Sequence, residues 1–269
     1  MTATLEKILK VKADEIARAK KVIPLETLRG DLESLPRCLN FYRTVTKPHP
    51  RGINVIAEIK RASPSAGVIR DDFDPVELAS AFQRAGADAL SVLTDETFFQ
   101  GSLEFIWQIK QSVNLPVLRK DFLIDPYQIY QSRVAGADAV LLIAEAVDPS
   151  RLMDMMILAN SLSMTVLLEV HEMDTLLQVR SMIGFPQAHY CLLGINNRNL
   201  KTMEVDLAHS IRMIEFVEDQ RGLISESGIK TRDDVSRLKQ AGFNGVLVGE
   251  TLLREPDVEK ALAELFDEI

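Results

Sequence analysis

The chain has 269 residues, which leaves room for one large domain or two small ones. Its 31 basic and 39 acidic residues give a net charge of −8, which excludes a protein dedicated to binding nucleic acid. The longest apolar run, residues 139–144, is far shorter than the roughly 20 residues that cross a bilayer, and the N-terminal segment has no apolar leader, so we expect a cytoplasmic protein without membrane contact.

Residues 1–50 precede the first predicted strand and are expected to form a helical arm. A helix over about 4–20 would carry Leu5, Ile8 and Ile16 on one broad apolar face. This face predicts that the arm packs on the rest of the chain, residues 51–269, which we expect to be the catalytic domain.

Eight short runs rich in Val, Ile and Leu follow, each bounded by turn residues. Most of them show little polar alternation, which is typical of strands that are covered on both faces of a parallel sheet. The predicted strands are 53–60, 87–94, 116–121, 137–144, 163–170, 191–197, 222–228 and 245–250.

Segments with helical spacing lie between these strands. The clearest are 75–85, 125–135, 148–160 and 230–241. Asp74, Asp125 and Asp148 each precede a proline, which predicts a carboxylate N-cap followed by proline at the first helical position. Strands and helices therefore alternate along the chain.

A repeat supports one particular architecture. The segments RAGADALSVLT (84–94), VAGADAVLLIA (134–144) and QAGFNGVLVGE (240–250) share a helix end, a glycine and a following strand. Residues 51–269 divided among eight such units give about 27 residues each, close to the minimum for a strand, a helix and two loops. We predict a (β/α)8 barrel of the α/β class; the alternative is an open doubly wound sheet, but its usual glycine-rich first turn is missing.

Polar and ionisable side chains collect at the carboxyl ends of five predicted strands, and a closed parallel barrel brings these ends to one rim. Glu58 and Lys60 lie two residues apart and so share one side of the first strand. The other four groups are 118–121, 167–169, 196–198 and 225–228. Each alone fits a solvated strand end or a structural ion pair, but several charges on one rim are typical of sites with shifted pKa values. Two lysines beside glutamates suit general acid–base work on a carbonyl compound, or a Schiff base.

Arg119 and Lys120 are neighbours on one strand, so their side chains must point to opposite faces. Only one of them can enter the mouth of the barrel. Lys120 shares its side of the strand with Leu118, and we predict that Lys120 points inward while Arg119 faces the surrounding helices.

Two glycine-containing segments, 226–228 and 249–251, follow the last two strands. In such barrels the backbone N–H groups of these loops, with a short extra helix, commonly hold a phosphate. Gly228 or Gly249 alone would equally fit turn chemistry, but the segment 250–254 can supply the short helix. We therefore expect a phosphorylated small-molecule ligand.

The sequence does not indicate a metal site. Cys38 and Cys191 lie far apart without a Cys-x-x-Cys partner, and His171 and His189 are not at ligand spacing from any Cys or His. Free thiols and metal-independent chemistry are the expectation.

Six segments together resemble the indole-3-glycerol phosphate synthase family, and with the arm segment KADEIARAKK (12–21) the resemblance covers essentially the whole chain. The six are IAEIKRASPSAG (56–67), PVLRKDF (116–122), LLEVH (167–171), GINNRNL (194–200), SESGI (225–229) and VGETLL (248–253). The resemblance implies ring closure of 1-(2-carboxyphenylamino)-1-deoxyribulose 5-phosphate to indole-3-glycerol phosphate, with loss of carbon dioxide and water, in tryptophan biosynthesis. It also implies that neither a metal nor an organic cofactor takes part.

The resemblance assigns residues as well. Lys120 would be the general acid that assists attack of the aromatic ring on the carbonyl, with Glu58 and Lys60 beside it, and Glu169 would take up or pass protons. Either lysine could serve the dehydration. The positioning residues it implies are Asn196, Arg198, Glu226 and Ser227, of which we place Asn196 and Glu226 in the catalytic group.

The phosphate residues implied in the same way are Lys60, Ser63, Gly228, Gly249 and Glu250. Several relatives have a serine where this chain has Glu250, so the assignment of Glu250 requires contact through its backbone N–H with the carboxylate turned away. The apolar side chains expected to suit the aromatic ring are Phe98, Phe122, Leu141 and Ile143, the last two of which would fit the core equally well.

Two other functions remain to be weighed. A sugar-phosphate isomerase on the same kind of barrel would share the phosphate loops but would not require the pair Lys60 and Lys120. A catalytically silent barrel that binds a phosphorylated metabolite would not require the polar strand ends. We expect the chain to act as a monomer.

Overall fold

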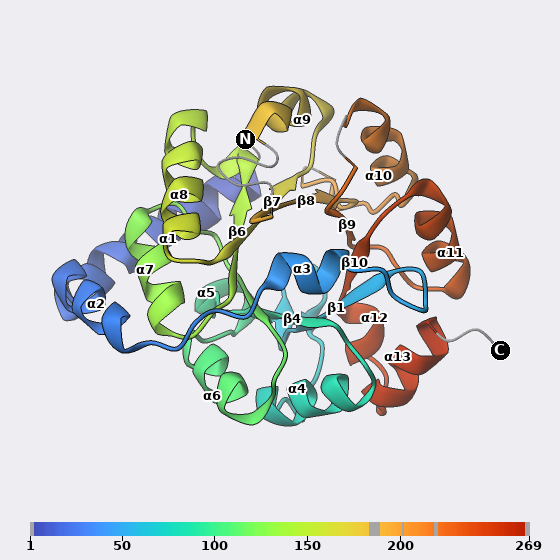
Figure 1. The fold of residues 1–269 in the computed structure, drawn as a ribbon, viewed down its shortest axis with the longest axis horizontal. Helices are drawn as coiled ribbons and strands as arrows, with labels where there is room; N and C mark the ends of the chain where they lie inside the picture. The colour runs from blue at the N-terminus through green and yellow to red at the C-terminus, as the bar shows by residue number, and fades with distance from the viewer. Residues whose placement is uncertain (1–2, 183–188, 201, 218–219, 267–269) are drawn as a thin grey trace.

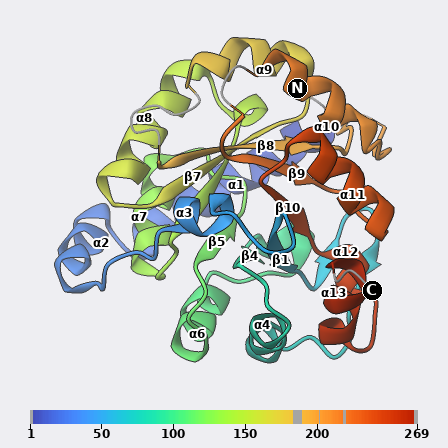
Figure 2. The ribbon, with the colours of Figure 1, turned by 45° about the vertical axis from the view of Figure 1, so that its right-hand side comes forward.

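The computed structural model describes residues 3–182, 189–200, 202–217 and 220–266. Within these residues, strands and helices alternate as the sequence predicts, and the helices surround the strands on all sides (Figures 1 and 2). No helix of the described part is long and apolar enough to cross a membrane.

The strands form a closed parallel barrel in the order β1-β10-β9-β8-β7-β6-β5-β4, in which β1 pairs with both β10 and β4. The predicted (β/α)8 fold is confirmed. The barrel strands are β1 (Asn54–Ile59), β4 (Ala89–Leu93), β5 (Val117–Lys120), β6 (Ala139–Ile143), β7 (Thr165–Val170), β8 (Cys191–Asn196), β9 (Leu223–Glu226) and β10 (Gly245–Val248). A small antiparallel hairpin that the sequence pattern did not predict, β2 (Ala62–Ser63) with β3 (Gly67–Val68), follows β1.

The helices that pack around the barrel begin where the sequence indicated. Asp74, Asp125 and Asp148 are all N-caps whose side chains accept backbone N–H groups, and proline follows each of them. The helices after β1 are α4 (Pro75–Arg84), α5 (Glu96–Phe99), α6 (Glu104–Ser112), α7 (Pro126–Val134), α8 (Pro149–Ser161), α9 (Met173–Val179), α10 (Ala208–Met213), α11 (Arg232–Ala241), α12 (Glu250–Leu253) and α13 (Val258–Phe266). The 3-10 turns in this part are η2 (Ala144–Ala146), η3 (Arg180–Met182) and η4 (Ile214–Phe216).

Side chains of the barrel strands alternate between two apolar layers. On β1, Val55 and Ala57 belong to the layer between strands and helices, whereas Ile56 belongs to the barrel interior. The interior also contains Leu118, Leu141, Leu167, Leu192, Ile224 and Leu247, one from each of six further strands. Because strand side chains repeat with a period of two, the next inward position on these strands lies at the carboxyl-terminal rim.

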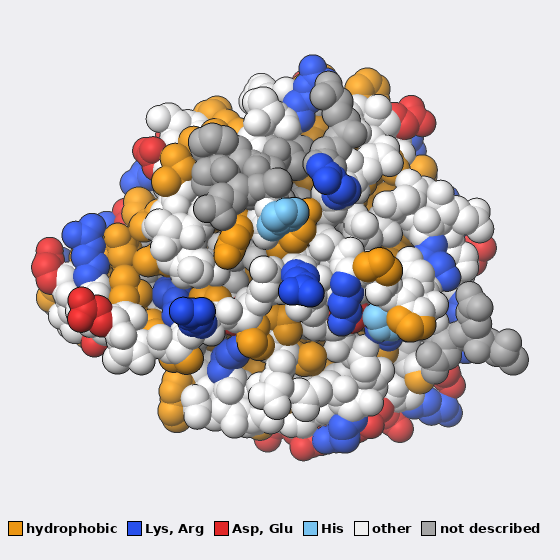
Figure 3. Space-filling view, in the orientation of Figure 1, with side chains coloured by type: hydrophobic (Ala, Val, Ile, Leu, Met, Phe, Trp, Pro, Cys, Tyr) orange, Lys and Arg blue, Asp and Glu red, His pale blue; other side chains and the backbone are white. Residues whose placement is uncertain are grey.

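The segment before β1 reaches both ends of the barrel. It contains α1 (Ala3–Val22), α2 (Leu25–Asp31), η1 (Leu32–Ser34) and α3 (Phe41–Thr46). The side chains of Phe41 and Val45 join the interior cluster, and the Tyr42 backbone N–H donates to Thr165 Oγ1 at the start of β7, so α3 covers the amino-terminal opening of the barrel (Figure 1). On that face, acidic side chains lie mostly near the periphery and several basic ones lie closer to the middle (Figure 3).

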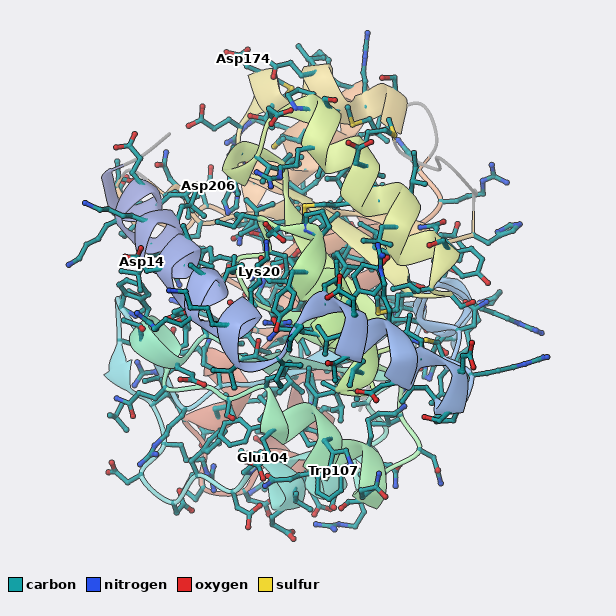
Figure 4. The ribbon with its side chains drawn as sticks, turned by 90° about the vertical axis from the view of Figure 1, so that its left-hand side faces the viewer. Asp14, Lys20, Glu104, Trp107, Asp174 and Asp206 are labelled. Carbon is teal, nitrogen blue, oxygen red and sulfur yellow. The ribbon has the colours of Figure 1, made fainter. Side chains whose placement is uncertain are left out.

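The first helix runs along the outside of the barrel beside α7. Lys20 forms an ion pair of 2.8 Å with Asp125, and the hydroxyl of Tyr127 donates to the carbonyl oxygens of Ala19 and Ile23. Asp14 lies on the exposed face of α1 (Figure 4). The amino-terminal half of α1 reaches the carboxyl-terminal rim, because Lys12 forms an ion pair with Asp121 directly after β5.

Candidate active site

A cavity of about 890 Å³ opens at the carboxyl ends of the barrel strands. All the predicted site residues except Phe98 line this cavity. They include Glu58, Lys60, Ser63, Lys120, Phe122, Glu169, Asn196, Arg198, Glu226, Ser227, Gly228, Gly249 and Glu250. The strand period explains this convergence, because Glu58, Lys120, Glu169 and Glu226 each lie two residues beyond an inward apolar residue of the same strand.

Phe98, the remaining predicted site residue, is not among the residues that line the cavity. Phe99, the next residue of the short helix α5, lines the cavity and lies with its ring centre 6.1 Å from that of Phe122. Successive residues of a helix are rotated by about 100°, so only one of the two rings can face the cavity. The Asp95 side chain accepts hydrogen bonds from the backbone N–H groups of both phenylalanines. It fixes the start of α5 and so decides which of the two rings faces the cavity.

Lys120 lies between two buried carboxylates. Its Nζ is 2.9 Å from Glu169 Oε2 and 2.9 Å from Glu226 Oε2. Arg119 points the opposite way, to Thr94, Asp121 and the helix α7, as the alternation of side chains predicted.

The charges of this group are strongly coupled. Burial opposes the charge on Lys120, but the carboxylates of Glu169 and Glu226 outweigh it and raise the pKa of the ammonium group. Burial and the neighbouring Glu169 charge raise the pKa of Glu226 to about 8. Despite burial, Lys120 and His171 hold the pKa of Glu169 well below its usual value. The group therefore combines an ammonium ion and a carboxylate with the carboxyl group of Glu226, which binds its proton more tightly than a free glutamate does.

Glu58 and Lys60, which both line the cavity, form a second ion pair, as their spacing of two residues predicted. Gly249 leaves the space that Glu58 occupies, because a Cβ atom at Gly249 would lie 2.5 Å from Glu58 Oε1. Gly194 does the same for Glu226, whose Oε1 would lie 2.2 Å from such an atom. A side chain at either glycine would therefore force the neighbouring site glutamate to shift.

The predicted phosphate residues follow β1, β9 and β10, which are neighbours in the barrel. Ser227 and Gly228 both have left-handed backbone conformations, with φ of 68° and 80°, and the carbonyl of Ser227 accepts a hydrogen bond from Asn197 Nδ2. Glu250 directs its carboxylate to Arg254, with Oε1 2.7 Å from one guanidinium nitrogen. Despite partial burial, Arg254 lowers the pKa of Glu250, so this carboxylate is engaged within the protein.

The opposite side of the cavity is apolar. Besides Phe99 and Phe122, it contains Leu141 and Ile143 from β6, which have both of the expected roles because they line the cavity and are buried. Leu5 and Ile8 of α1 also line it, and sequence reasoning missed them as site residues. The sequence predicts the apolar face of the arm, but it does not indicate where on the barrel that face packs.

His171 and Glu145 were also missed. His171 lies with Nε2 3.1 Å from Glu169 Oε1 and Nδ1 3.2 Å from Glu145 Oε2. Burial opposes the charge on His171, but Glu169 and Glu145 raise the pKa of the imidazole to about 10. The motif LLEVH contained the signal, because a histidine two residues after Glu169 on a strand shares its side.

In the described part of the chain, no three His, Cys, Asp or Glu side chains are grouped so that they could hold a metal ion. The site can bind an anion at one side and an apolar ring at the other, and it can donate a proton between them.

The comparisons with known proteins agree with this arrangement. The model of the family described as indole-3-glycerol phosphate synthase matches residues 5–265. An indole-3-glycerol phosphate synthase of Albidiferax ferrireducens is 48% identical over 267 residues, covering 99% of both chains. That of Rhodopirellula baltica is 44% identical over 261 residues, covering 97% of this chain and 98% of the relative.

Solved structures with little sequence similarity show the fold alone. A 3-hexulose-6-phosphate synthase matches with a TM-score of 0.62 and 15% identity, covering 79% of this chain and 98% of that one. A mutant tryptophan synthase alpha-subunit from Pyrococcus furiosus matches with a TM-score of 0.58 and 12% identity, covering 79% and 97%.

Proposed function

The chain belongs to the indole-3-glycerol phosphate synthase family, and from that membership we propose how its residues share the reaction. The enzyme is a carboxy-lyase of tryptophan biosynthesis. It closes the ring of 1-(2-carboxyphenylamino)-1-deoxyribulose 5-phosphate to give indole-3-glycerol phosphate, carbon dioxide and water.

Binding uses the two sides of the cavity. The phosphate is held by the loops that contain Ser63, Gly228 and Gly249, with the Lys60 ammonium group beside them. Glu250 contributes its backbone N–H, and the pairing of its carboxylate with Arg254 supports this assignment. The anthranilate ring lies against the apolar side, with Phe122 as the predicted contact, while Arg198, Asn196 and Ser227 orient the chain between ring and phosphate.

Ring closure needs a proton donor at the substrate carbonyl. As the ring carbon that bears the carboxylate attacks the carbonyl carbon, Lys120 donates a proton to the carbonyl oxygen, which becomes a hydroxyl group. The carboxylate then leaves as carbon dioxide, and its electron pair returns to the ring. The observation that supports this role is the position of Lys120, which two buried carboxylates hold in the cavity at 2.9 Å each.

Dehydration needs a second proton and a base. The hydroxyl group leaves as water when an acid protonates it, and a base removes a proton from the adjacent carbon to complete the indole. Glu169 takes up or passes protons in these steps, and Glu58 with Lys60 stands close by. Lys60 and Lys120 are both candidates for the acid. If Lys60 is this acid, a variant that lacks Lys60 should still release carbon dioxide but accumulate the hydroxylated ring, whereas a variant that lacks Lys120 should release no carbon dioxide in either case.

The same proposal covers a cytoplasmic location and a monomeric active unit. The direct test mixes purified protein with the carboxyphenylamino deoxyribulose phosphate and follows indole fluorescence. Wild-type turnover with loss of activity in Lys120→Met supports the proposal. A wild-type protein that isomerises a sugar phosphate and forms no indole would overturn it.

A further inference from the structure

A second, smaller cavity of about 280 Å³ lies beside the active site, between the start of α8 and the helix α9. Its walls include Glu145, Pro149 and Gln178, and the last two of these are exposed at the surface. His171 lines both this cavity and the active site, so its imidazole forms part of the wall between them.

An unbroken series of polar groups crosses this wall. Glu145 Oε2 lies 3.2 Å from His171 Nδ1, and His171 Nε2 lies 3.1 Å from Glu169 Oε1. The other oxygen of Glu169 lies 2.9 Å from Lys120 Nζ. Every step is within hydrogen-bond distance. The series begins at the second cavity and ends at the lysine that we propose as the acid.

The main chain holds the imidazole ring between its two carboxylates. The His171 backbone N–H donates to Glu145 Oε1 at 2.9 Å, and its carbonyl oxygen accepts from His209 Nε2 at 2.8 Å. The side chain is 3% exposed. The charged or titratable groups that face it are Glu169 from β7, Glu145 from η2 and, at its carbonyl oxygen, His209 from α10. Each ring nitrogen meets a carboxylate, so a proton can leave at Nε2 towards Glu169, and the ring must turn before a new proton is bound, because Nδ1 keeps its own proton.

The reaction consumes one proton per turnover. Protonation of the carbonyl oxygen takes one, departure of water takes another, and formation of the indole double bond returns one. This balance follows because a carboxylate leaves as neutral carbon dioxide. A proton must therefore enter the site in each cycle, and Lys120 is left neutral after ring closure.

We propose that Glu145 and His171 form a proton relay that restores the proton of Lys120 from the second cavity. His171 passes its Nε2 proton to Glu169, which passes it to the neutral Lys120 amine. The imidazole keeps its Nδ1 proton, so the ring must turn to bring the bare Nε2 towards the second cavity, where it recovers a proton from surface water through Glu145. The relay rests on the proposed role of Lys120 as the acid, and Glu145 and His171 act through Glu169 rather than on the substrate.

The test compares single and multiple turnovers of His171→Gln, Glu145→Gln and wild type with substrate labelled in its carboxyl group. A glutamine at either position can still donate or accept hydrogen bonds but cannot relay a proton. Release of carbon dioxide in one turnover, with enzyme in excess, needs only the proton already on Lys120. We expect that rate to stay within about twofold of wild type, whereas multiple-turnover kcat falls about tenfold or more with little change in KM.

Two further measurements complete the test. Imidazole added to His171→Ala should restore multiple turnover in proportion to the imidazole concentration. The matched control is His49→Gln, which should keep wild-type kinetics because His49 contacts Arg51 and Asp88 near the start of β1. The relay is overturned if both glutamine variants keep wild-type kcat, or if single and multiple turnovers fall equally and imidazole restores neither. An inactive wild type would instead refute the proposed function, so the two failures are distinguishable.

Discussion

The two faces of β5 allow a sharp test, because neighbouring basic residues on this strand should fail in different ways. Lys120 faces the cavity, and Lys120→Met removes the proton donor. Loss of a positioned acid lowers kcat by roughly 10²-fold to 10⁴-fold, which is about 2.7 to 5.4 kcal/mol of activation free energy. Glu226 can keep its proton and His171 still pairs with Glu169, so the site retains partners for its carboxylates and the fold should persist.

Arg119→Met should act on stability instead. The guanidinium group bonds Thr94, Ser132, Asp121 and the carbonyl of Gln128, and the residue is 5% exposed. Removing one partner of a buried ion pair costs about 3 to 5 kcal/mol of unfolding free energy. At roughly 2 to 4 °C per kcal/mol for a chain of this size, the melting temperature should fall by about 6 to 20 °C.

Circular dichroism melts and steady-state indole fluorescence on both variants provide the assay. Below the melting transition, folded Arg119→Met should keep most of its kcat, and Lys120→Met should melt close to wild type while losing turnover. A folded Arg119→Met protein without activity, beside an active Lys120→Met, would show that the roles assigned to the two faces of β5 are wrong.

Three other outcomes are expected. Gly249→Ala would place a Cβ atom 2.8 Å from the Cβ atom of Glu58 and should lower kcat about tenfold or more, whereas Gly30→Ala, with no atom within 4 Å, should leave kcat unchanged in the same assay. Burial and a neighbouring carboxylate raise the pKa of Glu226 from 4.5 to about 8, so between these pH values the folded state holds a proton that the unfolded state releases. The stability of the wild type should therefore fall as the pH rises. Melting temperatures measured from pH 5 to pH 9 should decline less steeply in Glu226→Gln. Removal of the 5-phosphate from the substrate should lower kcat/KM on the order of 10²-fold, and inorganic phosphate should compete with the substrate. Equal turnover of the dephosphorylated substrate would refute the assignment of the loops as a phosphate site.

Local patterns were sufficient for most of the fold. Strand period, apolar runs and Asp-Pro N-caps are properties of short segments, and they predicted the barrel strands and the starts of α4, α7 and α8. The same period brought Glu58, Lys120, Glu169 and Glu226 to one rim, because residues two apart on a strand share a face. These inferences need no knowledge of which distant segments meet.

The omitted partners depend on contacts between distant segments, whereas the choice between Phe98 and Phe99 depends on the local geometry of a short helix. Phe98 and Phe99 are equivalent in the sequence, and only the angle at which α5 leaves Asp95 separates them. Metal-ligand spacing alone gives no role to His171, because its partner Glu145 follows a different strand. Chemistry assigned from spacing along the chain cannot detect a partner that the barrel supplies from the neighbouring strand.

The arm shows most clearly how such contacts define the site. Lys12 of α1 lies 2.8 Å from Asp95 and 2.9 Å from Asp121, and its side chain is 4% exposed. Burial opposes the charge, but the two aspartates outweigh it and raise the pKa of Lys12. Asp95 starts the helix that carries Phe99, and Asp121 directly follows Lys120. One ammonium group from the arm therefore pairs with both Asp95, which starts the helix of the apolar wall, and Asp121, which follows the proposed acid. Removing it would leave Asp95 buried without this cation.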